Sequence, residues 1–142
     1  MTDTAKWRTE GVRIVRGATL ADAISGGGRA TVFDFAGASG SETWIGAVAV
    51  PPGGKTGAHH HGNTEVALYV VAGRAQLRWG ERLEFMANLG PGDFAHFAPF
   101  VPHQEVNPEA AQTLEFVVVR SNREGIAVAI QTMPAEAPED VY

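Results

Sequence analysis

Three consecutive histidines, His59 to His61, followed by Glu65 and by a distant His103, most strongly constrain the fold of this chain. Side chains alternate between the two faces of an extended strand, so His59 and His61 point to one side and His60 points to the other. Two imidazoles on one face, a carboxylate just past a turn and a distant third histidine converge only where a sheet rolls up on itself. We therefore expect a rolled β-sheet that carries these groups on its inner side.

The side chains of His59, His61, Glu65 and His103 make a plausible metal site. Neutral imidazoles and one carboxylate suit the borderline divalent ions of iron, manganese, nickel, zinc and copper. We expect one such transition metal ion per chain, in a site that leaves coordination positions open for water or substrate. A simple salt bridge is the alternative role for Glu65, and a packed or capping role is the alternative for His103.

The sequence around the histidines resembles the first of the two motifs that define the cupins, a superfamily of small β-barrels. That motif is a glycine, five residues, His-x-His, three or four residues, Glu, six residues and a glycine. Residues 53–73 follow it as GGKTGAHHHGNTEVALYVVAG, with seven residues instead of six between Glu65 and Gly73. We expect the extra residue to produce a β-bulge or a shifted turn in this strand.

Residues 92–107, GDFAHFAPFVPHQEVN, resemble the second cupin motif, in which Pro-x-Gly precedes the histidine and an asparagine follows it. The segment keeps Gly92, His103 and Asn107, but it has Ala98 and Phe100 where the family usually has proline and glycine. Two motifs in the right order are far more specific than either one alone. The resemblance covers roughly residues 43–120, and it implies a cupin barrel with His59, His61, Glu65 and His103 as metal ligands.

Short β-forming segments separated by turn signals favour a sandwich or barrel over a parallel α/β sheet. We predict an all-β protein, with a single cupin-type β-barrel domain (double-stranded β-helix, or jelly roll) over residues 1–142. The barrel core spans about residues 30–130, after a short N-terminal extension and before a loosely held acidic tail at 134–142. The expected strands are residues 12–16, 30–35, 43–50, 65–72, 74–79, 82–86, 94–97, 114–119 and 126–130, with one helical turn at 20–24.

The composition disfavours several classes of binding partner and ligand. A net charge of −5 with only two lysines makes a nucleic-acid partner unfavourable, because phosphate binding depends on clustered basic residues. The chain has no cysteine, so disulfides and thiolate ligands are excluded. No apolar run suggests secretion or a membrane span, and we expect a cytoplasmic protein without a membrane partner. By resemblance to small cupins we also expect a homodimer.

Two further side chains are candidates for catalysis. Alternation from His103 turns Glu105 inward, where its carboxylate would orient a water, act as a general base or hold an imidazole. An interior salt bridge to an arginine such as Arg74 or Arg78 is the alternative. Tyr69 shares the parity of Glu65 and is a candidate proton donor, with packing as its alternative. Asn107, which precedes a proline, is expected to form a turn.

The resemblance leaves two classes of function open. The first is a metal-dependent enzyme acting on a small organic molecule, with Fe(II) or Mn(II) oxygenase-type or carbonyl chemistry preferred and sugar or sugar-phosphate isomerase chemistry as an alternative. The second is a non-catalytic cupin that binds a small ligand. An inner cavity open beside Glu105 favours catalysis, and one filled by Trp44, Phe97 and Phe100 favours a structural role. A phosphosugar substrate would require basic side chains to converge at the cavity; the candidates are Lys55, Arg74, Arg78 and Arg82.

Overall fold

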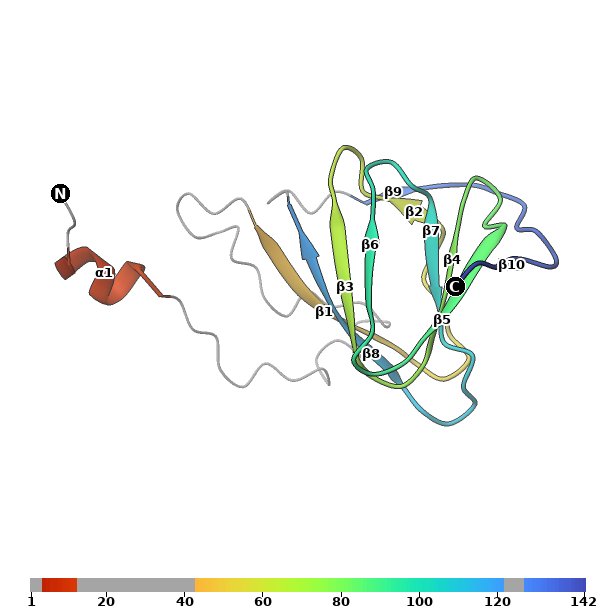
Figure 1. Cartoon of the computed structure of the whole chain (residues 1–142), viewed down its shortest axis with the longest axis horizontal. Coiled ribbons are helices and arrows are strands. Elements are labelled where there is room, and N and C mark those ends of the chain that lie inside the picture. The colour runs from red at the N-terminus through yellow and green to blue at the C-terminus, as the bar shows by residue number, and fades with distance from the viewer. Residues whose placement is uncertain (1–3, 13–42, 122–126) are drawn as a thin grey trace.

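The computed structural model describes residues 4–12, 43–121 and 127–142. The one helix of these residues is α1 (Thr4–Glu10), and the remaining elements are strands (Figure 1). In chain order the strands are β1 (Trp44–Val50), β2 (His59–His60), β3 (Val66–Ala72), β4 (Ala75–Trp79), β5 (Phe85–Leu89), β6 (Phe94–Phe97), β7 (His103–Val106), β8 (Leu114–Arg120), β9 (Val128–Ala129) and β10 (Glu139–Asp140).

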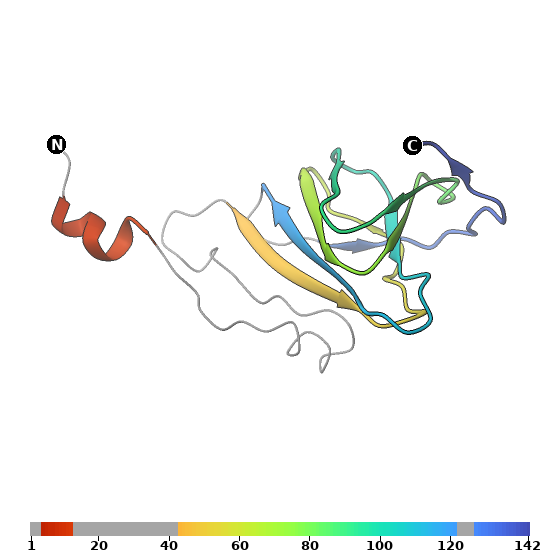
Figure 2. The same cartoon turned by 60° about the horizontal axis from the view of Figure 1, so that its bottom comes forward.

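The strands form two sheets that face each other. One has the order β1-β8-β3-β6 and the other has the order β10-β5-β4-β7-β2-β9. In Figure 1 the first sheet lies to the left of the second, and Figure 2 shows β1 and β8 running side by side along the outer edge. Neighbouring strands pair antiparallel except for β10, which pairs parallel with β5. The described residues therefore form the all-β jelly roll that the sequence predicted.

Alternating apolar residues build the core between the sheets. Along β3, Val66, Leu68 and Val70 are buried while the residues between them are exposed. β8 follows the same pattern through Leu114 and Phe116, which are almost completely buried. This period of two is what a strand with one buried face requires, and it fixes the register, because a shift by one residue would expose the whole apolar set.

The β-bulge predicted from the spacing of the first motif is confirmed. The register between β3 and β8 shifts between Val70 and Ala72. Gly73 then ends the strand with φ +82°, a conformation that residues with a side chain rarely adopt. A Cβ atom at this position would also lie 2.5 Å from the Thr113 carbonyl oxygen. The turn that follows β3 therefore depends on glycine.

Most predicted strands agree with the structure, but both boundaries of one strand, predicted at 82–86 and observed at Phe85–Leu89, were wrong. The predictions for β1, β3, β4, β6 and β8 fall within one residue of the observed bounds, whereas β5 begins three residues later than expected, at Phe85. The connection from Gly80 is longer because Leu83 adopts a left-handed backbone (φ 50°) with its side chain fully buried. The predicted elements at 13–16, 20–24 and 30–35 lie outside the described residues, as does residue 126 of the last predicted strand.

The C-terminal segment, expected to be loosely held, is hydrogen-bonded to the barrel. β10 pairs with β5, and the backbone N–H groups of Glu139 and Val141 donate to the carbonyls of Glu84 and Met86. The Arg78 guanidinium also donates to the Ala135 carbonyl at 2.7 Å. Without the C-terminal segment, β5 would be an edge strand with unpaired backbone N–H and carbonyl groups, and β10 supplies hydrogen-bond partners for them.

No helix within residues 4–12, 43–121 and 127–142 has the length and apolar character needed to cross a membrane.

Candidate metal centre

Three histidines meet inside the barrel, as the sequence predicted. His59 lies on β2, His61 follows that strand, and His103 begins β7, the neighbour of β2 in the same sheet. All three are buried, and one ring nitrogen from each lies within 4.8 Å of the others. Antiparallel pairing places His59 directly opposite His103, so the sheet itself brings the two motifs together. The three side chains form a buried group that could bind a metal ion.

Backbone carbonyl groups set the orientation of two of these rings. His59 Nδ1 lies 2.7 Å from the Gly57 carbonyl oxygen, and His103 Nδ1 lies 2.9 Å from that of Val101. A carbonyl oxygen only accepts, so each Nδ1 carries the proton and donates it. In the neutral ring the lone pair is then on Nε2. A hydrogen bond of this kind is how proteins orient metal-binding histidines and raise their basicity.

The Val101 carbonyl is presented by a tight loop before β7. Phe100 has φ 64°, and its N–H donates to the Gly62 carbonyl at 2.9 Å, which fixes the loop against the residue that follows the histidine triplet. Phe100 stands where the cupin pattern has glycine, and its left-handed backbone explains that preference. The sequence departs from the motif while the backbone keeps the conformation that the motif specifies.

His103 Nε2 faces the carboxylate of Glu105. Its distance to Glu105 Oε1 is 3.7 Å, and the side chains of these two residues are 1% and 6% exposed. His103 Nε2 is buried and has no hydrogen-bond partner among the described residues. A buried, unpartnered polar atom costs free energy and calls for an explanation, and the binding of a metal ion would provide one. The donor chemistry therefore fits a borderline divalent ion held by imidazole nitrogens.

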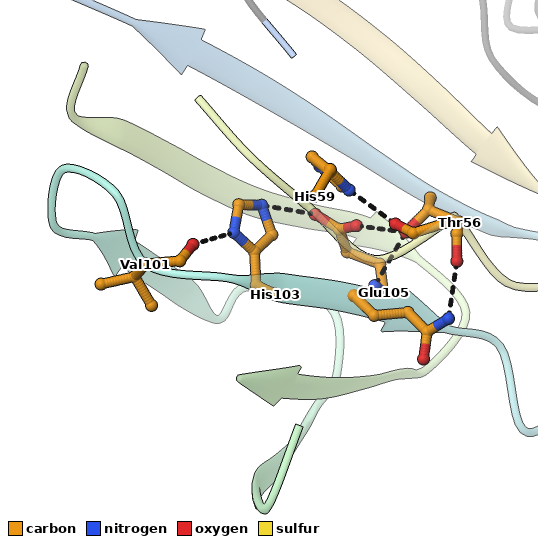
Figure 3. A network of polar contacts seen from close by, with 7 residues as sticks. Thr56, His59, Val101, His103 and Glu105 are labelled. Atoms are coloured by element: carbon orange, nitrogen blue, oxygen red, sulfur yellow. Dashed lines mark hydrogen bonds and ion pairs between the residues drawn. The ribbon is translucent and has the colours of Figure 1, made fainter. Parts of the chain in front are cut away.

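Thr56 anchors the other oxygen of Glu105, a contact that the sequence did not predict. Its hydroxyl donates to Glu105 Oε2 at 2.6 Å and accepts from the Glu105 backbone N–H at 3.0 Å (Figure 3). The two arginines named as possible partners of Glu105 have other partners: Arg78 donates to the Leu83 and Ala135 carbonyls, and Arg74 pairs with Glu109. Thr56 precedes the histidine triplet by three residues, and only the pairing of distant segments reveals its role.

The structure does not bring Glu65 to the histidines. Its carboxylate lies on the outer face, 3.1 Å from His96 Nε2, and both side chains are about 60% exposed. The reason is the register of β3, because Thr64 and Val66 occupy the buried positions on either side. Counting back from Gly73 with the spacing of the motif also reaches Val66 instead of Glu65. The strand keeps its apolar alternation and turns the acidic residue away from the interior.

Tyr69 is likewise on the outer face and not in the site. Its ring packs against Phe94, with centroids 4.7 Å apart, and the residue is 38% exposed. Tyr69 was correctly predicted to lie on the same face of the strand as Glu65, but both side chains lie on the outer face instead of the inner one. His60 points away from the cluster, as alternation required, and its Nδ1 accepts from the Gly62 N–H at 2.9 Å.

A cavity of about 700 Å³ lies near the histidine cluster, but its described lining includes none of His59, His61, His103 and Glu105. It lies between β4 and β5 of one sheet and β6 of the other, with Tyr142 among its lining residues. Its inner wall is apolar and includes Leu77, Trp79 and Phe97. Trp79 is the cross-strand neighbour of His103, and the Phe97 ring stacks on the His103 ring at 4.1 Å. Phe97 therefore borders both the cavity and the histidine cluster.

The comparisons with known proteins agree with this geometry. The cupin domain family matches residues 46–120, more than half of the chain, and the chain therefore belongs to the cupin family. The comparison with curated proteins gives no match. Among solved structures, an uncharacterized conserved protein with a double-stranded β-helix domain from Klebsiella pneumoniae is 20% identical with a TM-score of 0.65. That similarity covers 84% of this chain and all of the other.

Two enzymes of known fold are also similar. The polyketide cyclase RemF from Streptomyces resistomycificus is 24% identical with a TM-score of 0.60, over 76% of this chain and 72% of the cyclase. An oxalate oxidase in complex with glycolate is 16% identical with a TM-score of 0.56, over 62% of this chain and 46% of the oxidase. At these identities the similarity establishes the fold.

Proposed function

We propose that this cupin is a metal-dependent enzyme acting on a small organic molecule, with one divalent transition metal ion bound by His59, His61 and His103. The observation that carries the proposal is the convergence of three buried imidazoles, two of them held by backbone carbonyls with the lone pair on Nε2. Such an ion supplies Lewis acidity and, as Fe(II) or Mn(II), redox chemistry suited to oxygen or carbonyl substrates.

The cavity supports an enzyme over a purely structural metal site. Of the three aromatic residues considered as a plug, only Phe97 borders the cavity; Trp44 packs in the core beneath Arg120 and Phe100 is largely exposed. A space of about 700 Å³ that borders Phe97, whose ring stacks on His103, is within the range of cavities that hold small-molecule ligands, although Glu105 is not among its described lining residues. Phe97 and Trp79 exclude water from one side of the site, so that a polar contact there would be stronger than in water.

The lining favours an uncharged, largely apolar substrate, such as an aromatic molecule, over a phosphosugar. No lysine or arginine is among the described lining residues, and the ionisable side chains there are Asp93, His96 and Tyr142. Arg74 and Arg78 bind Glu109 and backbone carbonyls away from the cavity. Trp79, which lines the cavity, offers a flat face on which an aromatic ring stacks.

Metal analysis tests the proposal directly. Protein purified without chelator or nickel resin is expected to contain about one divalent metal ion per chain. His59→Ala and His61→Ala should lose that metal and keep the barrel fold, and His60→Ala is the matched control that should keep it. Protein that neither contains nor takes up a divalent ion would refute the metal site and leave a ligand-binding barrel.

Oxygen uptake tests the chemistry. The iron- or manganese-loaded protein should consume oxygen with at least one substrate from a panel of phenols, diketones and hydroxy acids, and the His59→Ala variant should not. Binding of aromatic compounds without turnover would instead favour the non-catalytic alternative. Turnover of a phosphorylated sugar would contradict the substrate class that the lining indicates.

A further inference from the structure

Glu105 is an acidic residue turned toward the histidine cluster from within the same sheet. It follows His103 by two residues on β7, so both side chains lie on the inner face. β3, by contrast, brings no carboxylate to the cluster, because Glu65 is on the outer face. The position of Glu105 raises the question of what its carboxylate does at 3.7 Å from an imidazole nitrogen.

Hydrogen-bond chemistry indicates that a positive charge belongs between these two groups, either a proton on His103 Nε2 or a bound cation. At 3.7 Å a proton on Nε2 would make an ion pair with Glu105 but no hydrogen bond. His103 Nδ1 donates to the Val101 carbonyl, so in the neutral ring Nε2 is an acceptor. An ionised carboxylate is also only an acceptor. Two buried acceptors that face each other repel, and burial removes the water that would screen them. A cation bound by both would turn this repulsion into attraction.

The distance between the two atoms also suits a shared ion. Nitrogen and oxygen ligands lie about 2.1 Å from ions of this type, so two donors on one ion are roughly 3 to 4 Å apart. The observed 3.7 Å lies within that range. Thr56 sets the direction of the carboxylate by binding Oε2, so that Oε1 is the oxygen turned toward His103 (Figure 3). The Thr56 backbone is held in turn by Gln104 Nε2, which donates to its carbonyl at 2.8 Å.

We propose that Glu105 supplies the carboxylate ligand of the metal centre, in place of Glu65, and that Thr56 is its positioning residue. The inference rests on the proposed function, in that it requires the histidines to bind an ion. It moves the acidic ligand from the first sequence motif to the second, two residues after the histidine that it accompanies. A site built in this way has its acidic donor and two of its histidines on the adjacent strands β2 and β7.

Cobalt(II) substitution tests the inference, because its visible absorption bands depend on the number and kind of donor atoms. Glu105→Gln should weaken Co(II) binding about 100-fold in a chelator competition and should change the bands. Glu65→Gln removes the same charge from the outer face and should change neither. Thr56→Val should weaken binding less than Glu105→Gln, and Thr56→Ser should restore it.

Each outcome separates the two proposals. If the wild-type protein binds no Co(II), the metal site itself is refuted. If the wild-type protein binds one ion and Glu105→Gln leaves the bands unchanged, Glu105 acts only on His103 and is not a ligand, whatever the change in affinity. A crystal structure of the metal-loaded wild-type protein decides the matter even if the variant fails to fold. An Oε1–metal distance of about 2.0 to 2.3 Å supports the inference and one above about 3 Å overturns it.

Discussion

Replacing Asn107 with alanine is expected to lower the free energy of unfolding by about 3 kcal/mol without changing metal binding. Asn107 is 1% exposed, and its side chain joins three backbone groups. Nδ2 donates to the carbonyls of Val50 at 3.0 Å and Gln112 at 2.8 Å, and Oδ1 accepts from the Glu109 N–H at 3.0 Å. The side chain thereby ties the end of β1 to the connection between β7 and β8.

The magnitude follows from these bonds. A typical hydrogen bond contributes about 1 kcal/mol, so three contribute about 3 kcal/mol, and buried groups left without partners would raise the cost. For a chain of this length the loss corresponds to a fall of about 10 °C in the melting temperature. Asn107→Asp should be at least as damaging at neutral pH, because it places a carboxylate oxygen against two carbonyl oxygens.

Urea unfolding of the metal-free protein, followed by circular dichroism, measures the effect. Asn63→Ala, at an exposed position, is the control and should change the free energy by less than about 0.5 kcal/mol. Metal content should stay at the wild-type value in every variant that folds. A loss of less than about 1 kcal/mol for Asn107→Ala would show that the three bonds are replaced by others and would refute the reasoning.

Three further predictions concern the backbone and the ion. Gly73→Ala should destabilise the protein by about 2 kcal/mol or more in the same urea assay, because it combines a φ of +82° with a contact to the Thr113 carbonyl; a neutral effect would contradict the geometry. Phe100→Gly should be more stable than Phe100→Ala by about 1 kcal/mol, because only the former relieves the left-handed backbone; equal stabilities would mean that the backbone there is unstrained. At a free ion concentration of 1,000 times Kd, the free energy of unfolding of the metal-loaded protein should exceed that of the chelator-treated, metal-free protein by about 4 kcal/mol. The His59→Ala variant should lose this difference. If removing the metal with a chelator leaves the free energy of unfolding of the wild-type protein unchanged, the result would argue against a site formed only in the folded state.

The sequence predicted the fold well because its strongest signals are local. The alternation in β3 and the turn residues at Gly73 and Gly92 mark strands and their ends without knowledge of their partners. The bulge was also predictable, since an extra residue in a strand has few other places to go. The start of β5 was not, because Leu83 takes a backbone conformation that propensity assigns to glycine or asparagine.

The site was predicted only in part because two strands determine it together. Alternation placed His59 and His61 on one face, but it does not say which face of β3 is buried, and that choice decided against Glu65 and Tyr69. The buried positions of β3 hold aliphatic residues, which outweigh a single carboxylate in setting the register. The anchor of Glu105 on Thr56 could not be seen at all, because the two residues meet only after the chain has folded.

The candidate metal ligands and the cavity lining come from different strands, and this separation affects how the substrate specificity of such a protein can change. The candidate ligands come from β2 and β7 and the residues beside them, whereas the cavity is lined mainly from β4, β5 and β6. Substitutions at Ala87, Leu89 or Ala95 would reshape the chamber without disturbing the atoms that hold an ion. In the enzyme that we propose, substitutions in the cavity would therefore change which substrate binds while the metal ligands stay the same, and the same separation offers a route for redesigning specificity in the laboratory.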